Sequence, residues 1–243
     1  MLCKHKEFLS KQKIVLGSSS PQRMRICKDL LGLTSLSVVA SNFAENIPKD
    51  SCRDAAEYCL RTTQGKVDSL NQQLEFDYNI LICADTIVVT DHGDILEKPI
   101  DAADATRMLT GLSGSSCKVL TSCILSFRVA GMPRQILTHV ESTSIEFLSL
   151  QAEDIAAYVS TGEPLNKSGA FGFQALGSSL VHRIVGCPYN VEGFPACAFA
   201  QMLNRAISIG SSCVQQAAKG IEGIVSSEIL ATNAGPEQQV SAA

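Results

Sequence analysis

The chain has 243 residues, 45% of them hydrophobic, so it is long enough to bury the core of one large α/β domain or of two small lobes. Its formal net charge of −4 argues against a general nucleic-acid binder, because such proteins need surplus positive charge to displace counterions from phosphates. Apolar runs fall well short of the roughly 20 residues that a transmembrane helix needs. We therefore expect a protein that binds neither nucleic acid nor membrane.

The ten cysteines are scattered and form no CxxC pair. This pattern predicts free thiols in a reducing compartment and therefore a cytoplasmic protein. Residues 1–12 lack the apolar core of a secretory signal and predict a flexible N-terminus. One α/β domain is expected over 13–210, and the Ser, Ala, Gly and Gln-rich segment 211–243 predicts a tail of low order.

The first predicted elements surround the sequence LGSSSPQR at 16–23. Residues 14–16 predict a short buried strand, and Ser20 and Pro21 predict the N-cap and first position of a helix whose apolar face holds Met24 and Cys27. Free amides and the helix dipole at such a start attract anions. The alternative is a serine-capped helix without ligand, because the GxxxxGK[ST] pattern of a P-loop is missing.

A strand is predicted at 36–40, followed by Glu45 and by a polar helix over 53–71 that holds Lys66. The most hydrophobic stretch, NILICADTIVVT at 79–90, predicts a central strand buried on both faces. Its Asp85 must have a partner, because an unpaired buried carboxylate costs several kcal/mol. Asp85 either caps a neighbouring turn or lies at a ligand crevice, where it holds a metal or a water.

Further elements follow at regular intervals. Asp101 is expected to cap a helix with Ala105, Met108, Leu109 and Leu112 on its apolar face. Strands are predicted at 118–128, 135–147 and 179–185, the first two as an antiparallel pair, and helices from 149 to 161 and from 195 to 207. The polar loop GEPLNKSGAFGFQALG at 162–177 is long enough to indicate function rather than mere connection.

Four cations, Arg23, Lys66, Lys98 and Lys167, fall at element ends or in loops. Each alone is compatible with an ordinary surface charge, whereas together they suit an anionic ligand. A set of motifs extends over about residues 12–205: LGSSSPQR, Glu45, Lys66, ADT (84–86), EKP (97–99), LSG (112–114), GEPLNKSGAFGFQ (162–174) and NVEGFP (190–195). In the order and spacing of these motifs, the chain resembles the Maf family of nucleoside triphosphate pyrophosphatases.

The resemblance implies an α/β fold with an elongated mixed sheet, flanking helices and a cleft between two lobes. It implies hydrolysis between the α and β phosphates of a nucleoside triphosphate by a homodimer that uses Mg²⁺ or Mn²⁺. Asp85 would be the general base or a metal ligand with Glu45, and Lys66 and Lys98 would stabilise phosphate charge. The implied substrate-binding residues are Ser18, Ser20, Gln22, Arg23, Thr86, Lys167 and Gln174.

Within the family the chain looks like the branch that acts on dTTP and UTP, with base selection by Gln22, Thr86 and Gln174. Four residues depart from that branch. Gln22 stands for an arginine and Asn166 for an aspartate, while Ser115 and Cys117 stand for an arginine and a histidine. The alternatives are a nucleotide-binding regulator of cell division with little turnover, and a pyrophosphatase that prefers methyl-GTP or ITP.

Overall fold

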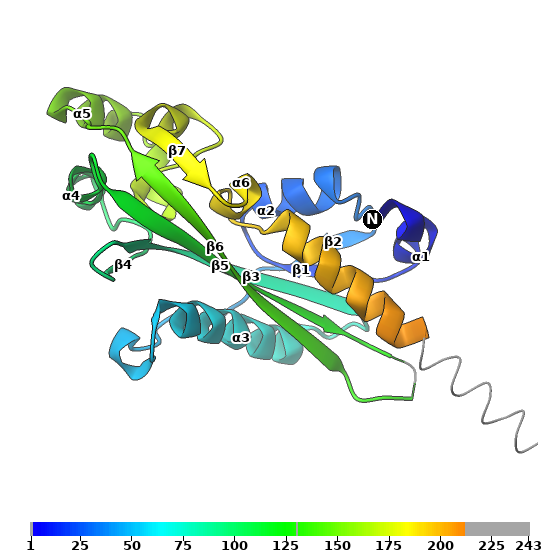
Figure 1. Cartoon of the computed structure of the whole chain (residues 1–243). Helices are drawn as coiled ribbons and strands as arrows, with labels where there is room; N and C mark the ends of the chain where they lie inside the picture. Colours follow the sequence, from blue (N-terminus) through cyan, green and yellow to red (C-terminus); the bar gives the residue numbers. More distant parts are fainter. Residues whose placement is uncertain (1, 130, 212–243) are drawn as a thin grey trace, which may run out of the picture.

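The computed structural model describes residues 2–129 and 131–211, so the expected low-order tail lies almost entirely outside the described residues. The described part of the chain builds a seven-stranded mixed sheet in the order β2-β1-β3-β5-β6-β7, with β4 paired to β3 (Figure 1). The strands are β1 (Ile14–Gly17), β2 (Leu36–Val38), β3 (Ile80–Thr90), β4 (Ile95–Leu96), β5 (Ser116–Phe127), β6 (Gln135–Phe147) and β7 (Val181–Val185).

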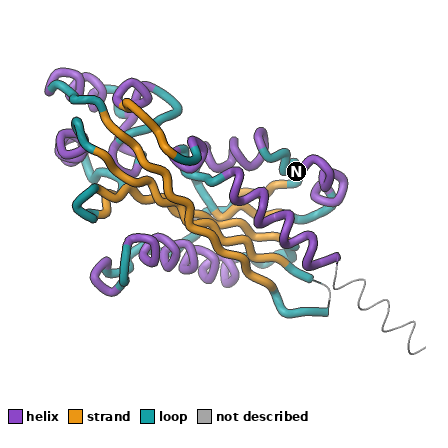
Figure 2. The backbone as a smooth tube through the Cα atoms, viewed as in Figure 1, coloured by secondary structure: helices purple, strands orange, loops and turns teal. Residues whose placement is uncertain are grey.

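The sheet is parallel at one side and antiparallel elsewhere. Strand β1 runs parallel to both β2 and β3, whereas β3, β5, β6 and β7 pair antiparallel in succession. The β3–β5 ladder extends from Ile80↔Phe127 to Thr90↔Cys117. Strands β3, β5 and β6 connect the end of the sheet that carries β1 and β2, the first lobe, with the end that carries β4 and β7, the second lobe. The strands are the orange tubes of Figure 2, and the expected elongated mixed sheet is confirmed.

Helices cover both faces of the sheet. Helix α3 (Ala55–Gln73) packs on one face through Val67 and Leu70, while the helix of residues 196–211 covers the opposite face near the N-terminal segment (Figure 1). The other α-helices are α1 (Lys6–Ser10), α2 (Pro21–Arg25), α4 (Ala102–Leu112), α5 (Ala152–Ser160) and α6 (Pro188–Val191).

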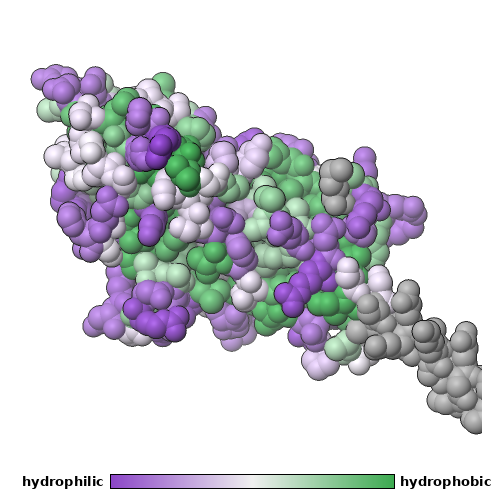
Figure 3. Space-filling model, viewed as in Figure 1, coloured by the Kyte–Doolittle hydropathy of each residue, from purple (hydrophilic) through white to green (hydrophobic). Residues whose placement is uncertain are grey.

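The hydrophobic core divides along the length of the sheet. One cluster, which includes Leu16, Ile82 and Phe199, lies beneath the helix of 196–211. Another, which includes Leu109 and Phe171, packs α4 and α5 at the other end. On the face shown in Figure 3, hydrophobic and hydrophilic side chains are interspersed. No helix within residues 2–129 and 131–211 is long and apolar enough to cross a membrane.

The N-terminal segment, which is expected to be flexible, contains helical turns. Residues Leu2–His5 form a 3₁₀ turn and Lys6–Ser10 form α1. Leu9 is only 4% exposed and joins the core cluster beneath the last helix. Burial of this one leucine gives the basic segment a packing partner that its composition did not indicate.

The helix after the serine turn begins as predicted, with Ser20 at the N-cap and Pro21 at the first position. Residues Ile26–Leu30 form a π-helical turn closed by the bond from the Leu31 N–H to the Ile26 carbonyl. On the predicted apolar face, Cys27 is buried as expected, whereas Met24 is exposed and Ile26 is buried instead.

The helix expected from 149 begins later, at Ala152, and its predicted face at Ile155 and Tyr158 is buried. Its start is delayed because Ser113 holds the preceding backbone: Ser113 Oγ accepts from the Leu150 N–H at 2.7 Å. The strand expected from 179 likewise begins at Val181, after the 3₁₀ turn Leu176–Leu180. The predicted cap at Asp101 is confirmed by its 2.8 Å bond from the Asp104 N–H.

Candidate functional site

A cleft of about 630 Å³ lies between the two lobes. Its walls come from the serine turn, the segment before α3, the middle of β3, the 97–98 segment and the loop of 166–174. All of the predicted site residues line it: Ser18, Ser20, Gln22, Arg23, Glu45, Lys66, Asp85, Thr86, Lys98, Lys167 and Gln174. Residues that lie far apart in the sequence thus meet in one cavity.

Asp85 has the partner that its buried position requires. Its Oδ1 lies 2.6 Å from Lys66 Nζ, and the two residues are only 8% and 7% exposed. The same Nζ lies 3.1 Å from Glu45 Oε1. Removing either member of a buried ion pair leaves an uncompensated charge, so the pair fixes both side chains in the cleft. The alternative in which Asp85 caps a neighbouring turn has no hydrogen bond to support it within the described residues.

Glu45 reaches Lys66 because its loop lies directly on α3. A Cβ on Gly65 would stand 2.4 Å from the ring atom Cζ of Phe43, so only glycine permits this close contact. Glu45 itself has a φ of 50°, which is the left-handed region that non-glycine residues rarely adopt. Such strained positions occur disproportionately at functional sites.

Arg23 connects the serine turn to the rest of the cleft. Its Nε donates to the Gly193 carbonyl at 2.8 Å, one terminal nitrogen donates to Thr86 Oγ1 at 2.8 Å, and the other donates to Ser18 Oγ at 3.4 Å. A guanidinium has five N–H groups. Two therefore remain for a ligand, and Arg23 is held in a fixed orientation to present them.

The Thr86 hydroxyl is occupied inside the protein. Besides accepting from Arg23, Thr86 Oγ1 lies 3.0 Å from Thr121 Oγ1 and 3.4 Å from the Gly193 carbonyl. Thr121 is fully buried. The structure thus joins Thr86 to Arg23, and the part in base selection that the resemblance implies for Thr86 stays a prediction.

The loop that carries Lys167 and Gln174 is fastened at both ends. Ser168 Oγ donates to the Thr86 carbonyl at 2.8 Å. Farther along, the Glu163 carboxylate accepts from the Tyr158 hydroxyl at 3.0 Å and from the N–H groups of Leu176 and Gly177 at 3.1 and 3.3 Å. Glu163 therefore organises this loop and is absent from the lining of the cleft.

Two of the predicted cations have no partner in the part of the chain that the structure describes. Neither the Lys98 nor the Lys167 side chain has a hydrogen bond or ion pair there. Gln22 is partly engaged, because its Oε1 accepts from Ser20 Oγ at 3.3 Å and its NH₂ group stays available. The cleft thus offers unpaired positive charge beside unpaired amide donors, which suits an anion that also carries a polar ring.

The departures from the family pattern fall in different places. Gln22 and Asn166 line the cleft. Ser115 lies elsewhere, and its hydroxyl donates to the Leu112 carbonyl at 2.9 Å. Cys117 is buried in the core cluster of the second lobe. Only the first two departures can therefore alter contacts with a ligand in this cleft.

The carboxylates of Asp85 and Glu45 fit a hard divalent cation. Mg²⁺ binds carboxylate oxygens and is typically held by one or two protein carboxylates together with substrate phosphates. No group of three or more His, Cys, Asp or Glu side chains suited to a metal occurs within residues 2–129 and 131–211. Asp85 and Glu45 pair with Lys66 through one oxygen each, which leaves one carboxylate oxygen of each for such a cation.

Several residues of the site were missed by sequence reasoning. The Gly193 carbonyl fixes Arg23, and Ser168 fixes the later loop. Glu97 also lines the cleft, and its carboxylate accepts from the buried Tyr58 hydroxyl at 2.6 Å. Gly193 and Glu97 belong to the motifs NVEGFP and EKP, which could have marked them as candidate site residues. The motifs do not show which neighbours these residues contact.

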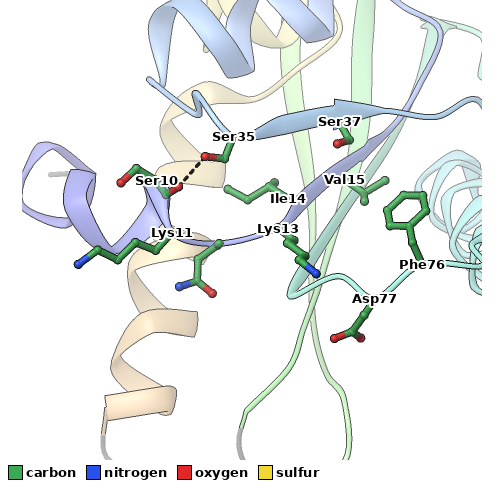
Figure 4. Close-up of a pocket in the computed structure, with 10 residues that line it drawn as sticks. Ser10, Lys11, Lys13, Ile14, Val15, Ser35, Ser37, Phe76 and Asp77 are labelled. Carbon is green, nitrogen blue, oxygen red and sulfur yellow. Dashed lines mark hydrogen bonds between the residues drawn. The ribbon is translucent and has the colours of Figure 1, made fainter.

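A second hollow of about 400 Å³ lies beside the start of β1 (Figure 4). Lys11 and Asp77, which line it, are paired with Glu7 and Arg128. The dashed bond in Figure 4 joins the Ser35 hydroxyl to the Ser10 carbonyl at 2.6 Å. This hollow contains none of the predicted site residues, and the cleft between the lobes is therefore the candidate site.

Comparison with known proteins gives consistent matches. The family model described as Maf-like protein matches residues 13–206. The chain is 36% identical to a dTTP/UTP pyrophosphatase of Clostridium perfringens (strain SM101 / Type A), over 75% of this chain and 91% of the relative. It is 39% identical to a dTTP/UTP pyrophosphatase of Syntrophomonas wolfei, over 78% and 95%. Among solved structures, a HAM1 protein from Coxiella burnetii is similar over 55% of this chain and 72% of that chain, with 12% identity and a TM-score of 0.35.

Proposed function

Because the chain belongs to the Maf-like protein family, we propose that it is a nucleoside triphosphate pyrophosphatase that hydrolyses dTTP and UTP to the nucleoside monophosphate and pyrophosphate. The observation that carries this proposal is the convergence of all the predicted site residues on one cleft. The similarity to proteins named dTTP/UTP pyrophosphatase supports the choice of substrate.

Asp85 is the residue we assign to activation of water. Its Oδ1 is taken by Lys66, and its Oδ2 has no hydrogen bond within the described residues. The free oxygen can accept a proton from a water molecule held against the α-phosphate, as a general base does. Lys66 orients this carboxylate and keeps its charge compensated while the cleft is empty.

The cations are assigned to the triphosphate. Lys98 and Lys167 are unpaired in the described structure, and Arg23 has two N–H groups to spare. When the bond between the α and β phosphates breaks, negative charge moves to the leaving pyrophosphate. Prepositioned positive groups stabilise that charge without reorganising, which is the main catalytic contribution that a protein makes to phosphoryl chemistry.

A divalent cation bound by Asp85 and Glu45, Mg²⁺ or Mn²⁺, would neutralise phosphate charge and act as a Lewis acid toward the phosphoryl oxygens. The serine turn lines the same cleft. Ser20 Oγ accepts from the Arg23 N–H and Ser18 Oγ accepts from the Ser20 N–H, so both side chains are held in place at the start of α2. The remaining hydroxyls and amides of this turn would bind phosphate oxygens.

Base selection is assigned to Gln22 and Gln174, with Thr86 acting through Arg23. The Gln174 side chain is unpaired within the described residues, so it can both donate to and accept from the imide edge of uracil or thymine. Gln22 offers its NH₂ group, since Ser20 occupies its carbonyl. This arrangement suits a pyrimidine with a carbonyl and an N–H side by side.

The nine described cysteines are all free. This supports placing the protein in a reducing compartment such as the cytoplasm, where thiols stay unpaired. The homodimer that the resemblance implies would be measured by light scattering on the purified chain.

The experiment that tests the proposal is a substrate panel. The full chain is incubated with dTTP, UTP, CTP, methyl-GTP and ITP in the presence of Mg²⁺ or Mn²⁺, and pyrophosphate release is measured. The proposal expects the highest kcat/KM with dTTP and UTP. Preference for ITP or methyl-GTP would contradict the base assignment, and nucleotide binding without release from any of the five would support the regulator instead.

A further inference from the structure

Glu97 contacts three segments that are distant in the sequence. It follows β4 and directly precedes Lys98. Its Oε1 accepts from the Tyr58 hydroxyl at 2.6 Å, its Oε2 lies 3.1 Å from Lys49 Nζ, and its backbone carbonyl accepts from the Gly169 N–H at 3.0 Å. One residue thus joins α3, the turn Lys49–Ser51 and the turn Ser168–Ala170.

Each joined segment carries or adjoins a residue of the cleft. Helix α3 carries Lys66, the turn at Lys49 follows the loop of Glu45, and the turn at Gly169 follows Lys167. We infer that Glu97 is a positioning residue that sets the relative places of these segments and of its neighbour Lys98. The inference deepens the proposed function and, for its catalytic readout, rests on it.

The contacts of Glu97 are well constrained. Tyr58 is 2% exposed, so its hydroxyl is buried and Glu97 is its acceptor. Burial and the neighbouring Glu97 carboxylate raise the pKa of Tyr58, which therefore remains a donor at neutral pH. Lys49 Nζ also stands 5.9 Å from the centre of the Tyr58 ring. The bond from the buried Tyr58 hydroxyl therefore anchors Oε1 of Glu97, whereas the pair with Lys49 is exposed and adds little.

The bond from the Gly169 N–H to the Glu97 carbonyl is held in place by close packing of the Gly169 turn. Gly169 has a φ of +69°, and a Cβ at this position would lie 2.8 Å from Val88 Cγ2. The turn is thus pressed against β3 while its N–H bonds to Glu97. A shift of Glu97 would move the Lys98 segment relative to both β3 and α3.

A direct role toward the substrate is disfavoured because both carboxylate oxygens of Glu97 already have protein partners. Positioning and direct contact predict different results in a double-mutant cycle. Tyr58→Phe removes only the hydroxyl, Glu97→Gln keeps an acceptor for it, and Glu97→Ala removes the contact entirely.

For a positioning residue, we expect Tyr58→Phe and Glu97→Ala each to lower kcat for dTTP on the order of tenfold or more, because small displacements of catalytic groups have effects of this size. KM should change less. The double variant Tyr58→Phe/Glu97→Ala should have a kcat no lower than that of Glu97→Ala, since both substitutions break the same bond between Tyr58 and Glu97. Glu97→Gln should keep most of the activity. The inference would be overturned if Glu97→Gln had a kcat as low as that of Glu97→Ala while Tyr58→Phe kept the kcat of the unmodified chain.

Glu146→Ala is the matched control. It removes another carboxylate, which pairs with Arg183 at 2.6 Å outside the cleft. Its activity should equal that of the unmodified chain. If Glu146→Ala lowered kcat as much as Glu97→Ala, the effect would be general loss of structure, and the positioning role would be rejected.

Hydrogen–deuterium exchange tests the inference without turnover. Tyr58→Phe should speed amide exchange at 95–100 and at 168–172 together, although neither segment contains the substitution. Unchanged exchange at both would refute the role of Glu97 even in an active enzyme. Coupled acceleration in a chain that hydrolyses no nucleotide would support the role of Glu97 and reject the proposed function alone.

Discussion

Lys66 Nζ lies 2.6 Å from Asp85 Oδ1 and bonds to it inside the cleft. The same nitrogen lies 3.1 Å from Glu45 Oε1, so one cation stands between two carboxylates. Asp85 lies within a hydrophobic central strand, where an unpaired charge would be costly. Lys66 thus allows a carboxylate to occupy the floor of the cleft with one oxygen left free for chemistry.

Asp85→Asn tests the chemical assignment. The amide keeps the size of the side chain and loses the proton acceptor, so kcat for dTTP should fall by about 10²–10⁴-fold, the range attributed to general bases. The fold should persist, as circular dichroism would show. Asp104→Asn, in the ion pair of α4 with Arg107 outside the cleft, is the control and should retain full activity. Unchanged kcat in Asp85→Asn would exclude the role given to Asp85.

Lys66→Met tests the energetic role of the buried pair. The substitution leaves Asp85 with an uncompensated charge, so the free energy of unfolding should fall by about 3–5 kcal/mol, as when one partner of a buried ion pair is removed. Urea denaturation of the two chains would measure the difference. Lys118→Met, at an exposed position of β5, should change the midpoint little. Equal stability of Lys66→Met and the unmodified chain would show that the pair is unimportant for folding.

Gly169→Ala tests the placement of the late loop. The φ of +69° at Gly169 and the nearby Val88 side chain both oppose a Cβ, so the substitution should introduce about 1–3 kcal/mol of strain. The loop should shift as a result, and KM for dTTP should rise. Gly111→Ala is a matched control on α4, because nothing lies within 4 Å of its added Cβ. That variant should gain about 0.5–1 kcal/mol of stability and keep its KM. Equal KM values in both variants would argue against this account of the loop.

Alkaline pH should destabilise the fold through its buried thiols. Burial raises the pKa of Cys27, Cys59, Cys83 and Cys117 from 9.0 to about 12. The folded chain therefore keeps these protons at pH values where the unfolded chain releases them. Their contribution to stability is complete below pH 9 and is lost as the pH rises toward 12, by up to ~1.4 kcal/mol per thiol and pH unit.

The measurement is the urea midpoint at pH 7 and pH 10 under reducing conditions. Cys83→Ala should show a smaller drop between the two pH values than the unmodified chain, since one raised pKa has been removed. A midpoint that is the same at pH 7 and pH 10 would contradict the expected direction.

The elements that could be predicted were those specified by neighbouring residues. Ser20 and Pro21 define the start of α2 by local capping, and Asp101 does the same for α4. The hydrophobic run of 79–90 was sufficient to predict the central strand, which the structure places at Ile80–Thr90. Local chemistry determines these features, so sequence pattern alone reveals them.

Features that depend on tertiary contact could not be predicted in the same way. The need of Asp85 for a partner was clear, yet nothing in the sequence identifies Lys66 on α3 as that partner. The π-helical turn after α2 forms without a distinctive sequence pattern. Glu97 was visible within its motif, but its contacts with Tyr58, Lys49 and Gly169 exist only after the chain has folded.

The measurement that tests the central claim most directly is the identity of the products formed from dTTP and UTP. The full chain with Mg²⁺ should convert each nucleotide into equal amounts of the nucleoside monophosphate and pyrophosphate, as seen by anion-exchange chromatography, and Asp85→Asn should form far less of both. Formation of the nucleoside diphosphate and inorganic phosphate, or no product from either nucleotide, would contradict the claim that this cleft cuts between the α and β phosphates.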